Sequence, residues 1–459
     1  MRRVAQLIAT GAGWMSRRAG RGGGTSLPGM VLLRMRPRAA EELSGGLTRG
    51  SVAISATNGK TTTARLVRSV LDAEGMAVVA NSAGANLLTG VTAALLDASR
   101  RRSGPPAEIG LFEVDEAALP AVVDQVHPSV VVLMNLFRDQ LDRYGELETL
   151  LVRWRTMIAS LDDHTTLVLN ADDPATAVLG LERERVLTFG VDDPAVDRHT
   201  LAHAADSTHC PRCDEPLVYD LITIGHQGHW RCTSCGLHRQ APDIAATVVT
   251  LDGVDGVALT ARTPDGPVDV RVALPGLHNA YNVLAALGTA IALGFDAADA
   301  AKALGTTKAA FGRAEHVEID GRRLMLLLAK NPAGANENIR TVLGDPEPVQ
   351  VMVMLNDRTA DGRDVSWIWD VDHEPLFDRL AHLVVAGDRA EDLALRFRYG
   401  GLPTDGVVVE RDTARALDAL VAATPVGGTA YVLPTYTAML DLRAELVRRG
   451  VAQAFWEDS

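Results

Sequence analysis

Several features that would assign a function at once are absent from this chain of 459 residues. No stretch approaches the ~20 apolar residues of a membrane-spanning helix, and the apolar part of the first residues is too short for a secretory signal. Positive charge is not in excess, because the formal net charge is −13, which argues against a protein built mainly to hold nucleic acid. We expect a cytoplasmic enzyme of two or three domains without a transmembrane segment.

Lysine is scarce as well. Of 45 basic residues only four are lysines, so arginine serves at nearly every position where a generic cation suffices. The four are Lys60, Lys302, Lys308 and Lys330. A lysine inside a recognisable motif is therefore more informative here than in an average chain.

Lys60 lies in such a motif, between a short apolar run and an amphipathic helix. The segment Ser55-Ala56-Thr57-Asn58-Gly59-Lys60-Thr61-Thr62-Thr63 is typical of a phosphate-binding loop. In such a loop Gly59 lets the backbone approach phosphate oxygens, Lys60 contributes positive charge, and Thr61 offers a hydroxyl to Mg²⁺. The free N–H groups of the helix that follows also attract phosphate. We predict that ATP binds at Thr57, Asn58, Gly59, Lys60, Thr61 and Thr62.

Cysteine is equally rare, and its four positions form one pattern. Cys210 and Cys213 give C-x₂-C, eighteen residues intervene, and Cys232 and Cys235 give a second C-x₂-C. This spacing is typical of a zinc ribbon, in which four thiolates hold a structural Zn²⁺; two disulfides in a secreted chain are the alternative. A closed zinc site would leave no free thiol for catalysis. We expect the insert, residues 203–240, to be held together by zinc.

The remaining pattern predicts an α/β protein with two sheets. Short apolar runs alternate with helical stretches and indicate a parallel sheet within residues 46–305, into which the zinc-ribbon insert is placed. A helical segment precedes it in residues 1–45, and a second α/β unit follows in residues 306–459. The expected strands are 52–54, 109–114, 130–135, 167–170, 186–189, two or three within 244–273, 324–328, 349–355, 383–386, 407–409 and 429–433.

Polar residues at the ends of these strands carry further chemistry. Glu113 closes one strand within plausible reach of the loop, and a carboxylate there suits the Mg²⁺ of ATP. The acidic residues that follow, Asp115 and Glu116, fit better as a helix N-terminus. Asn279 and Asn282 lie one helical turn apart and could read the edge of a nucleotide.

These motifs together resemble the Mur ligases, which with folylpolyglutamate synthetase form amide bonds through an acyl phosphate. The resemblance is carried by 57–62, Glu113, Asp139-x-x-Asp142-Arg143-Tyr144, Asn170-Ala171-Asp172-Asp173-Pro174 and His278-Asn279-x-x-Asn282. It implies that Lys60 and Thr61 hold phosphate and Mg²⁺, that Glu113 holds Mg²⁺, and that Asn279 and Asn282 face the nucleotide. Arg313 resembles the family's γ-phosphate arginine, and Lys330 stands where the family places a contact to substrate and phosphate.

Departures from the general pattern point to one branch of the family. Gln140 replaces a histidine of the usual second-metal site, while the segments 25–29, 356–357 and 361–370 resemble ligase subunits that amidate lipid II. The resemblance implies that ATP activates the α-carboxylate of D-glutamate in the peptidoglycan stem at the inner face of the membrane. Ammonia then comes from a separate, GatD-type glutaminase subunit.

The resemblance also suggests how that partner is completed. Asp364 would orient the histidine of the partner's Cys–His pair, Trp367 and Trp369 would anchor the interface, and residues 306–459 would bind the partner. Two other interpretations stay open: a Mur or folylpolyglutamate-type ligase that adds an amino acid, and a non-catalytic zinc-ribbon protein that binds a partner or nucleic acid.

Overall fold

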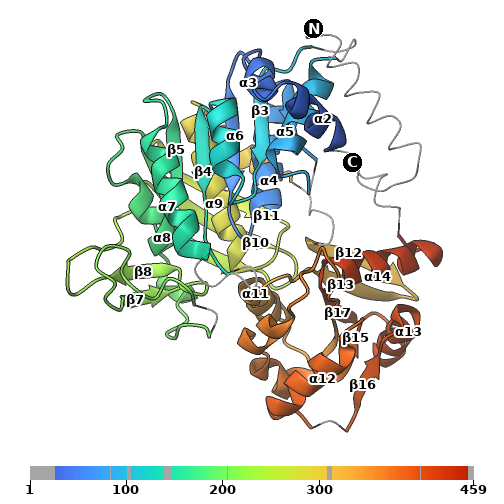
Figure 1. The fold of residues 1–459 in the computed structure, drawn as a ribbon. Helices are drawn as coiled ribbons and strands as arrows, with labels where there is room; N and C mark the ends of the chain where they lie inside the picture. Colours follow the sequence, from blue (N-terminus) through green and yellow to red (C-terminus); the bar gives the residue numbers. More distant parts are fainter. Residues whose placement is uncertain are drawn as a thin grey trace.

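The computed structural model describes residues 26–82, 84–100, 105–138, 146–203, 205–307, 313–403 and 405–452. Within these ranges the chain forms two large sheets covered by helices and one small hairpin (Figure 1). The expected N-terminal helical segment is present in its described part as α2 (Leu27–Met35) and α3 (Ala39–Ser44). Both helices pack against α5 (Leu88–Ala98) of the central sheet.

The central sheet has nine strands in the order β11-β10-β9-β6-β5-β4-β1-β3-β2. From β2 at one edge to β9, every strand runs parallel to its neighbour in this order. At the other edge, β9, β10 and β11 form an antiparallel meander. The strands are β1 (Ser51–Ser55), β2 (Val78–Ala80), β3 (Ile109–Glu113), β4 (Val130–Leu133), β5 (Thr166–Asn170), β6 (Val186–Val191), β9 (Ile244–Leu251), β10 (Val257–Thr263) and β11 (Gly266–Val272).

Both faces of this sheet are covered by helices, which explains its nearly continuous apolar strands. One core joins the sheet to α4 (Lys60–Ala73), α9 (Leu277–Ala292) and α10 (Ala297–Leu304). The other joins it to α5, α6 (Leu119–Val126), α7 (Glu146–Ala159) and α8 (Pro174–Ala177). β1 lies between β3 and β4, so the loop after β1 opens where the strand order reverses, the usual place for a ligand in such sheets.

The C-terminal sheet has six strands in the order β12-β13-β17-β14-β15-β16. They are β12 (Arg313–Ile319), β13 (Arg322–Leu327), β14 (Val349–Met354), β15 (Leu380–Ala386), β16 (Val407–Glu410) and β17 (Thr429–Pro434). Helices α11 (Pro332–Leu343) and α12 (Ala390–Tyr399) cover one face together with η4 (Ser366–Asp370) and η5 (Glu374–Arg379). Helices α13 (Thr413–Ala423) and α14 (Tyr436–Arg448) cover the other.

The predicted α/β class and the parallel sheet of the central domain are confirmed, and the predicted second α/β unit contains a sheet that is also largely parallel. Two strands of these sheets were missed, as were both strands of the small hairpin. β2 has three residues at a sheet edge, too short to leave a pattern, and β12 alternates charged and apolar residues because it is an antiparallel edge strand.

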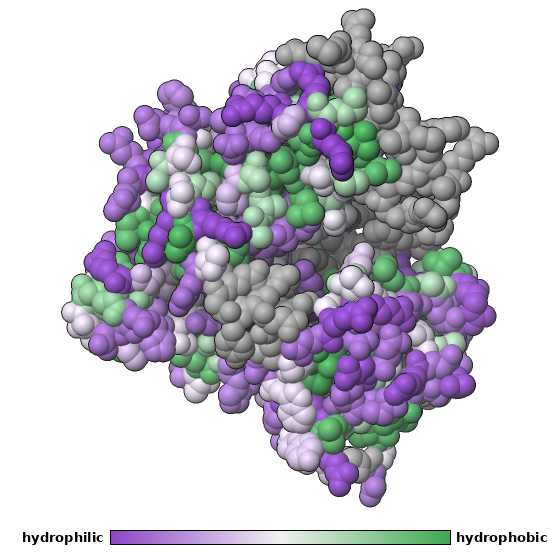
Figure 2. All heavy atoms as spheres, in the orientation of Figure 1, coloured by the Kyte–Doolittle hydropathy of each residue, from purple (hydrophilic) through white to green (hydrophobic). Residues whose placement is uncertain are grey.

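The insert between β6 and β9 holds a two-stranded hairpin, β7 (Val218–Ile222) and β8 (Gly228–Arg231). Among the described residues, no helix is both long enough and apolar enough to cross a membrane. Hydrophilic residues cover most of the face shown in Figure 2, with apolar residues in smaller groups.

Candidate ATP-binding and ligase site

The loop after β1 has a backbone that only glycine can adopt without strain at its last position. Gly59 has a φ of 95° and caps the N-terminus of α4. A Cβ atom added there would lie 2.2 Å from Oδ1 of Asn282. The close approach of α9 therefore fixes both the identity of this residue and the path of the loop.

The loop is also tied to the end of β4 by side chains that the sequence did not reveal. The backbone N–H of Asn58 donates to Oδ1 of Asn135 at 2.9 Å, and Nδ2 of Asn135 donates to the carbonyl of Asn58 at 3.0 Å. The hydroxyl of Thr57 donates to the carbonyl of Phe137 and accepts from its N–H at 3.0 Å. The buried Thr57 thus holds the loop in shape, and the loop is formed before any ligand binds.

Hard oxygen groups meet at the start of α4. The Thr61 hydroxyl donates to Oε1 of Glu113 at 2.9 Å. Glu113 ends β3, and its backbone is fixed by Asn81, which both accepts from its N–H and donates to its carbonyl. A hydroxyl and a carboxylate side by side at a phosphate loop are the ligands that Mg²⁺ requires.

Lys60 is buried and bound to two oxygens of the protein. Its ammonium donates to Oε2 of Glu116 at 2.8 Å and to the carbonyl of Ala56. The sequence had assigned Glu116 to a helix N-terminus, and the ion pair gives it a different neighbour. A phosphate placed on this loop would have to compete with Glu116 for the ammonium.

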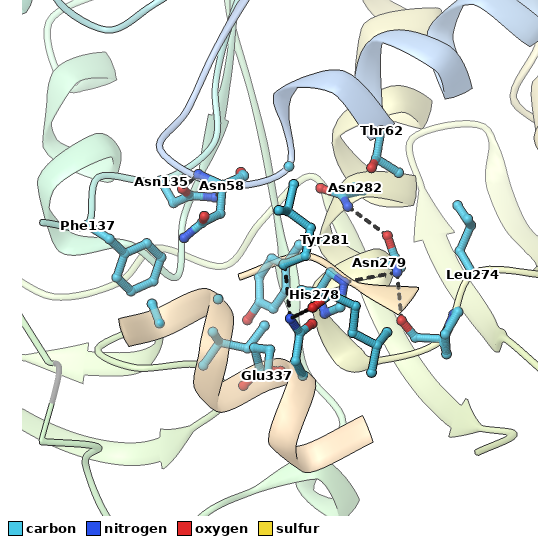
Figure 3. A pocket seen from close by; sticks show the side chains of 18 of the residues that line it. Asn58, Thr62, Asn135, Phe137, Leu274, His278, Asn279, Tyr281, Asn282 and Glu337 are labelled. Carbon is cyan, nitrogen blue, oxygen red and sulfur yellow. Dashed lines mark hydrogen bonds between the residues drawn. The ribbon is translucent and has the colours of Figure 1, made fainter. Parts of the chain in front are cut away.

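A pocket of about 110 Å³ opens beside the loop, between the central sheet and the C-terminal domain (Figure 3). From the central domain it is lined by Asn58, Gly59, Thr62, Asn135, Phe137, His278, Asn279, Tyr281 and Asn282. From the C-terminal domain it is lined by Leu327, Leu328, Lys330, Ala333, Gly334, Glu337 and Asn338. The predicted loop and the predicted Lys330 therefore lie on opposite walls of one cavity.

The two walls are joined directly at the loop. Nδ2 of Asn331 donates to Oδ1 of Asn58 at 3.0 Å, and Nδ2 of Asn58 donates back to Oδ1 of Asn331 at 3.3 Å. Asn331 also caps α11 by accepting from the N–H of Gly334 at 2.8 Å. One asparagine thus connects the phosphate loop to the first turn of a helix in the other domain.

Asn279 and Asn282 lie at the N-terminal end of α9, facing the pocket (Figure 3). Nδ2 of Asn282 donates to Oδ1 of Asn279 at 2.8 Å, and Nδ2 of Asn279 donates to the carbonyl of Pro275 at 2.7 Å. Oδ1 of Asn282 accepts from the Thr63 hydroxyl at 3.3 Å. These hydrogen bonds hold both side-chain amides in place within the protein before a ligand binds.

The cysteine insert reaches this pocket with the tip of its hairpin. Ile224 and Gln227 line the pocket, and the carbonyl of Thr223 accepts from Arg340 of the C-terminal domain at 3.2 Å. The Thr223 hydroxyl lies 2.6 Å from the Tyr281 hydroxyl. The insert is therefore part of the pocket wall, which the sequence did not indicate.

Two aspartates after β5 hold this tip in place. Oδ2 of Asp172 accepts from the Tyr281 hydroxyl at 2.6 Å, and its Oδ1 accepts from Arg239 of the insert at 2.6 Å. Burial, together with the charge of Asp172, raises the pKa of Tyr281 well above its usual value. Oδ2 of Asp173 accepts from the N–H of Leu136 at 3.0 Å and lies 3.3 Å from Nε2 of His226.

The four cysteines converge at the other end of the insert. Their Sγ atoms all lie within 4.8 Å of one another, with Cys210 to Cys235 at 3.6 Å and Cys213 to Cys232 at 3.5 Å. These separations suit four thiolates around one tetrahedral ion. Backbone N–H donors, that of Cys235 first, lower the pKa of the Cys232 thiol to about 7, which favours the thiolate that binds metal.

Asp364 lies apart from the pocket, in the segment before η4. Its Oδ1 accepts from the N–H of Ser366 at 2.8 Å and from the Ser366 hydroxyl at 2.5 Å, and the side chain is half-buried. Asp361 is buried and binds the N–H and the hydroxyl of Thr437. Of the two aspartates, Asp364 is the more accessible.

The prediction that both tryptophans of this segment anchor an interface is wrong for Trp367. Its side chain is 6% exposed and belongs to the core of the C-terminal domain. Trp369 is 47% exposed, and its ring centroid lies 5.9 Å from that of the exposed Tyr399. The 3-10 helix places the two tryptophans on opposite sides of one turn.

Two groups of predicted residues lie outside the described part of the chain. They are the segment 139–145, including Gln140 and the Asp139-x-x-Asp142-Arg143-Tyr144 motif, and the side chain of Arg313, whose backbone begins β12. Spacing alone could not reveal the ion pair of Lys60 with Glu116 or the anchoring of the loop by Asn135, because each joins residues from segments far apart in the sequence.

Comparisons with known proteins agree with this geometry. Residues 54–290 match the family model for the Mur ligase middle domain, and residues 328–439 match the model described as MurT ligase C-terminal. The chain is 32% identical over 433 residues to subunit MurT of lipid II isoglutaminyl synthase (glutamine-hydrolyzing) from Staphylococcus aureus, covering 93% of each chain.

The chain is also 32% identical to the corresponding subunit from Streptococcus pneumoniae, and the alignment covers 94% of each chain. Among solved structures, a pseudomurein peptide ligase type C from Methanothermus fervidus aligns over 92% of this chain and 84% of its own, with a TM-score of 0.69 and 19% identity. Sequence and fold lead to one conclusion: the chain belongs to the Mur ligase family, in its MurT branch.

Proposed function

We propose that this chain is the ligase subunit of a lipid II isoglutaminyl synthase. It uses ATP to activate the α-carboxylate of D-glutamate in the lipid II stem peptide as an acyl phosphate. Ammonia then displaces the phosphate and gives D-isoglutamine. The ammonia is released from glutamine by a separate GatD-type glutaminase, and the reaction takes place at the cytoplasmic face of the membrane.

The observation that carries this proposal is likeness over nearly the full chain to a MurT subunit, at 32% identity. The chain is an ATP-dependent ligase of the Mur family, and its pocket opens beside the loop at Thr57–Thr62. All four of its cysteines lie in one cluster, so a cysteine nucleophile for glutamine hydrolysis would have to come from another chain.

We assign the phosphate contacts to the loop and to α4. Lys60 leaves Glu116 when phosphate arrives, and its charge then offsets the negative charge that gathers on the transferred phosphoryl group. Lys330, on the opposite wall, contacts the carboxylate or the phosphate of the substrate. Asn279, Asn282 and Arg313 are assigned to the nucleotide.

Metal ions fit two places. Thr61 and Glu113 offer the hard oxygen ligands that Mg²⁺ takes on ATP, where it would neutralise phosphate charge. The four clustered thiols offer the donor set of a structural Zn²⁺. The zinc role is to fix the insert, whose tip carries Ile224 and Gln227 into the pocket.

Mass spectrometry of lipid II incubated with this chain, ATP and Mg²⁺ tests the proposal. Parallel samples receive ammonium, glutamine, or a mixture of free amino acids. We expect ammonium alone to exchange one carboxyl hydroxyl for an amine, and glutamine to work only after the glutaminase is added.

Addition of an amino acid mass would instead make the chain an ordinary Mur-type ligase. No change of mass under any condition, with ATP bound, would favour a binding protein without catalysis. Either result would contradict the proposal.

A further inference from the structure

Two residues of the large pocket come from the cysteine insert and have no part in the chemistry assigned so far. Ile224 and Gln227 are the first and last residues of the turn at the tip of the β7–β8 hairpin. The N–H of Gln227 donates to the carbonyl of Ile224 at 2.8 Å, and Gly225, with a φ of 58°, supplies the left-handed backbone of the turn. The turn therefore brings both of its end residues to the pocket.

This tip is fixed over the ends of two strands of the central sheet. Gly225 packs so closely on Phe137, which follows β4, that an added Cβ atom would lie 2.7 Å from the ring. The ring of His226 also packs on Phe137, with centroids 4.6 Å apart. Nε2 of His226 lies 3.3 Å from Oδ2 of Asp173, which follows β5. The protein alone thus sets the position of the tip, before any ligand binds.

The strand order places this tip on one side of the phosphate loop and the magnesium ligands on the other. β1 lies between β3, which ends at Glu113, and β4, and β5 is the next strand beyond β4. The oxygens of Thr61 and Glu113 therefore meet on the side of the loop that faces β3. A nucleotide with its phosphates on the loop can extend its base towards the ends of β4 and β5, where the insert lines the pocket.

The pocket wall near the tip combines apolar surface with one unused amide. Phe137 and Tyr281 (Figure 3) and the insert's Ile224 provide aromatic and aliphatic surface. Gln227 is 2% exposed, and its side-chain amide makes no hydrogen bond with any residue that the structure describes. A buried amide without a partner costs free energy, so this position favours a ligand that offers it hydrogen bonds.

A nucleobase has the chemistry that this combination requires. Its faces are apolar, and its edge carries hydrogen-bond donors and acceptors. A glutamine amide has one acceptor and two donor hydrogens, so it can pair with the amino group and a ring nitrogen of adenine at the same time. An acidic stem peptide would need positive charge instead, and none of the four residues just named carries any.

We propose that Gln227 recognises the adenine base of ATP, so that the cysteine insert is a base-recognition element of the ligase. The inference rests on the proposed function in one respect, because it takes ATP to be the nucleotide at the loop. Ile224 and Phe137 cover the base, and the amide of Gln227 exchanges hydrogen bonds with its edge. The four cysteines then act on ATP binding through the position of a single side chain.

The test compares ATP with purine riboside 5′-triphosphate, which lacks the 6-amino group of adenine. Calorimetry in the presence of Mg²⁺ would measure the binding of each to the full chain and to Gln227→Met. This substitution keeps the length of the side chain and removes its amide. The matched control is Gln240→Met, at an exposed position of the same insert outside the pocket.

We expect the unaltered chain and Gln240→Met to bind ATP about tenfold more tightly than the analogue. Gln227→Met should bind both nucleotides equally, at the weaker affinity. A preference for ATP that persists in Gln227→Met would overturn the proposal. So would an equal loss of affinity for both nucleotides, or the absence of any preference in the unaltered chain.

Melting curves without nucleotide separate recognition from folding. Gln227→Met should melt with the Gln240→Met control, because the amide it removes has no partner among the described residues. If it melts earlier, Gln227→Ala takes its place and the same comparison of two nucleotides decides. Amidation is not part of this measurement, so a failure of the unaltered chain to amidate lipid II would contradict the proposed function without changing the result for Gln227.

Discussion

The two walls of the large pocket differ in how their chemistry is arranged. Next to the central-domain wall, at the start of α4, Lys60 is paired with Glu116 and Thr61 is hydrogen-bonded to Glu113. On the C-terminal wall, Lys330 follows β13 and lies among the mostly apolar residues Leu327, Leu328, Ala333 and Gly334. Phosphate transfer needs dense, preorganised charge, so the proposed function assigns it to the central-domain side of the pocket and assigns contacts to the rest of the substrate to the C-terminal side.

Removing the charge on the central wall tests this division with the largest effect. Lys60→Met should lower amidation by about 10²–10³-fold with either nitrogen source, because the phosphoryl group loses its cation before nitrogen is used. Rates of lipid II amidation with ammonium and with glutamine would be compared. Lys302→Met, which removes an exposed lysine paired only within α10, is the control and should match the unaltered chain.

A loss confined to the glutamine reaction would contradict the account, since Lys60 would then act on nitrogen supply. Full activity of Lys60→Met with both sources would remove the phosphate loop from the mechanism.

A change on the C-terminal side should affect one nitrogen source alone. The resemblance implies that Asp364 orients a histidine of the partner. On that hypothesis Asp364→Asn should lower glutamine-driven amidation by roughly 10²-fold or more and leave ammonium-driven amidation unchanged. Glutamate release by the complex is the direct readout. Equal loss with both sources would refute the role.

Asp361→Asn provides the contrast within the same segment. Asp361 is buried and binds Thr437 at the start of α14, so this substitution should cost about 1–3 kcal/mol of stability and lower the melting temperature. Asp364→Asn should leave the melting temperature nearly unchanged.

Disturbing the four cysteines of the insert should affect both the melting temperature of the protein and the activity at the large pocket. Cys213→Ser should reduce bound zinc and lower turnover of lipid II roughly tenfold, because the tip with Ile224 and Gln227 loses its fixed position. Zinc content and the melting temperature would be measured with activity. Ser234→Ala, between two of the cysteines, is the control.

Retention of zinc and of full activity in Cys213→Ser would show that the four-thiolate cluster does not position the pocket wall. Loss of zinc with unchanged turnover would confine the cluster to folding of the insert.

The smallest expected effect is on the pH dependence with which the β7–β8 hairpin of the insert is held against the end of β6. Nε2 of His229 lies 3.3 Å from Oδ1 of Asp192, and this pairing raises the pKa of His229 and lowers the pKa of Asp192 to about 2. His229 then contributes stability that is complete below its ordinary pKa of 6.5 and is lost as pH rises through its raised value. Asp192 contributes stability above its ordinary 3.8, lost as pH falls towards 2.

Hydrogen exchange of the β7–β8 hairpin should therefore quicken as pH rises above about 6.5, beyond the intrinsic change of the exchange rate. His229→Gln, which can still donate to the carbonyl of Val191, should abolish this dependence. An identical pH profile in His229→Gln would contradict the assignment to this pair.

Local spacing predicted much of this molecule. The phosphate loop, Glu113 and the four cysteines were found because each signal lies within a short stretch of sequence, and most strands of both sheets were found because buried parallel strands are apolar throughout. The residues that were missed depend on contacts between distant segments. Asn58 and Asn331 are 273 positions apart, and Lys60 and Glu116 are 56 apart.

The hairpin tip of the insert shows the same limit. Spacing revealed its cysteines, but Ile224 and Gln227 reach the pocket only because Asp172 and Tyr281 hold the insert against α9. Trp367 was misassigned because an exposed and a buried tryptophan look alike in a sequence, and only the turn of η4 separates them.

The most direct measurement follows the nitrogen itself. The complex of this chain with its proposed glutaminase would receive lipid II, ATP and either glutamine labelled with ¹⁵N in its side-chain amide or ¹⁵N-labelled ammonium. We expect ¹⁵N to enter the stem amide of lipid II from both sources, and this incorporation to require ATP and this chain. Absence of nitrogen from either source in lipid II would contradict the account.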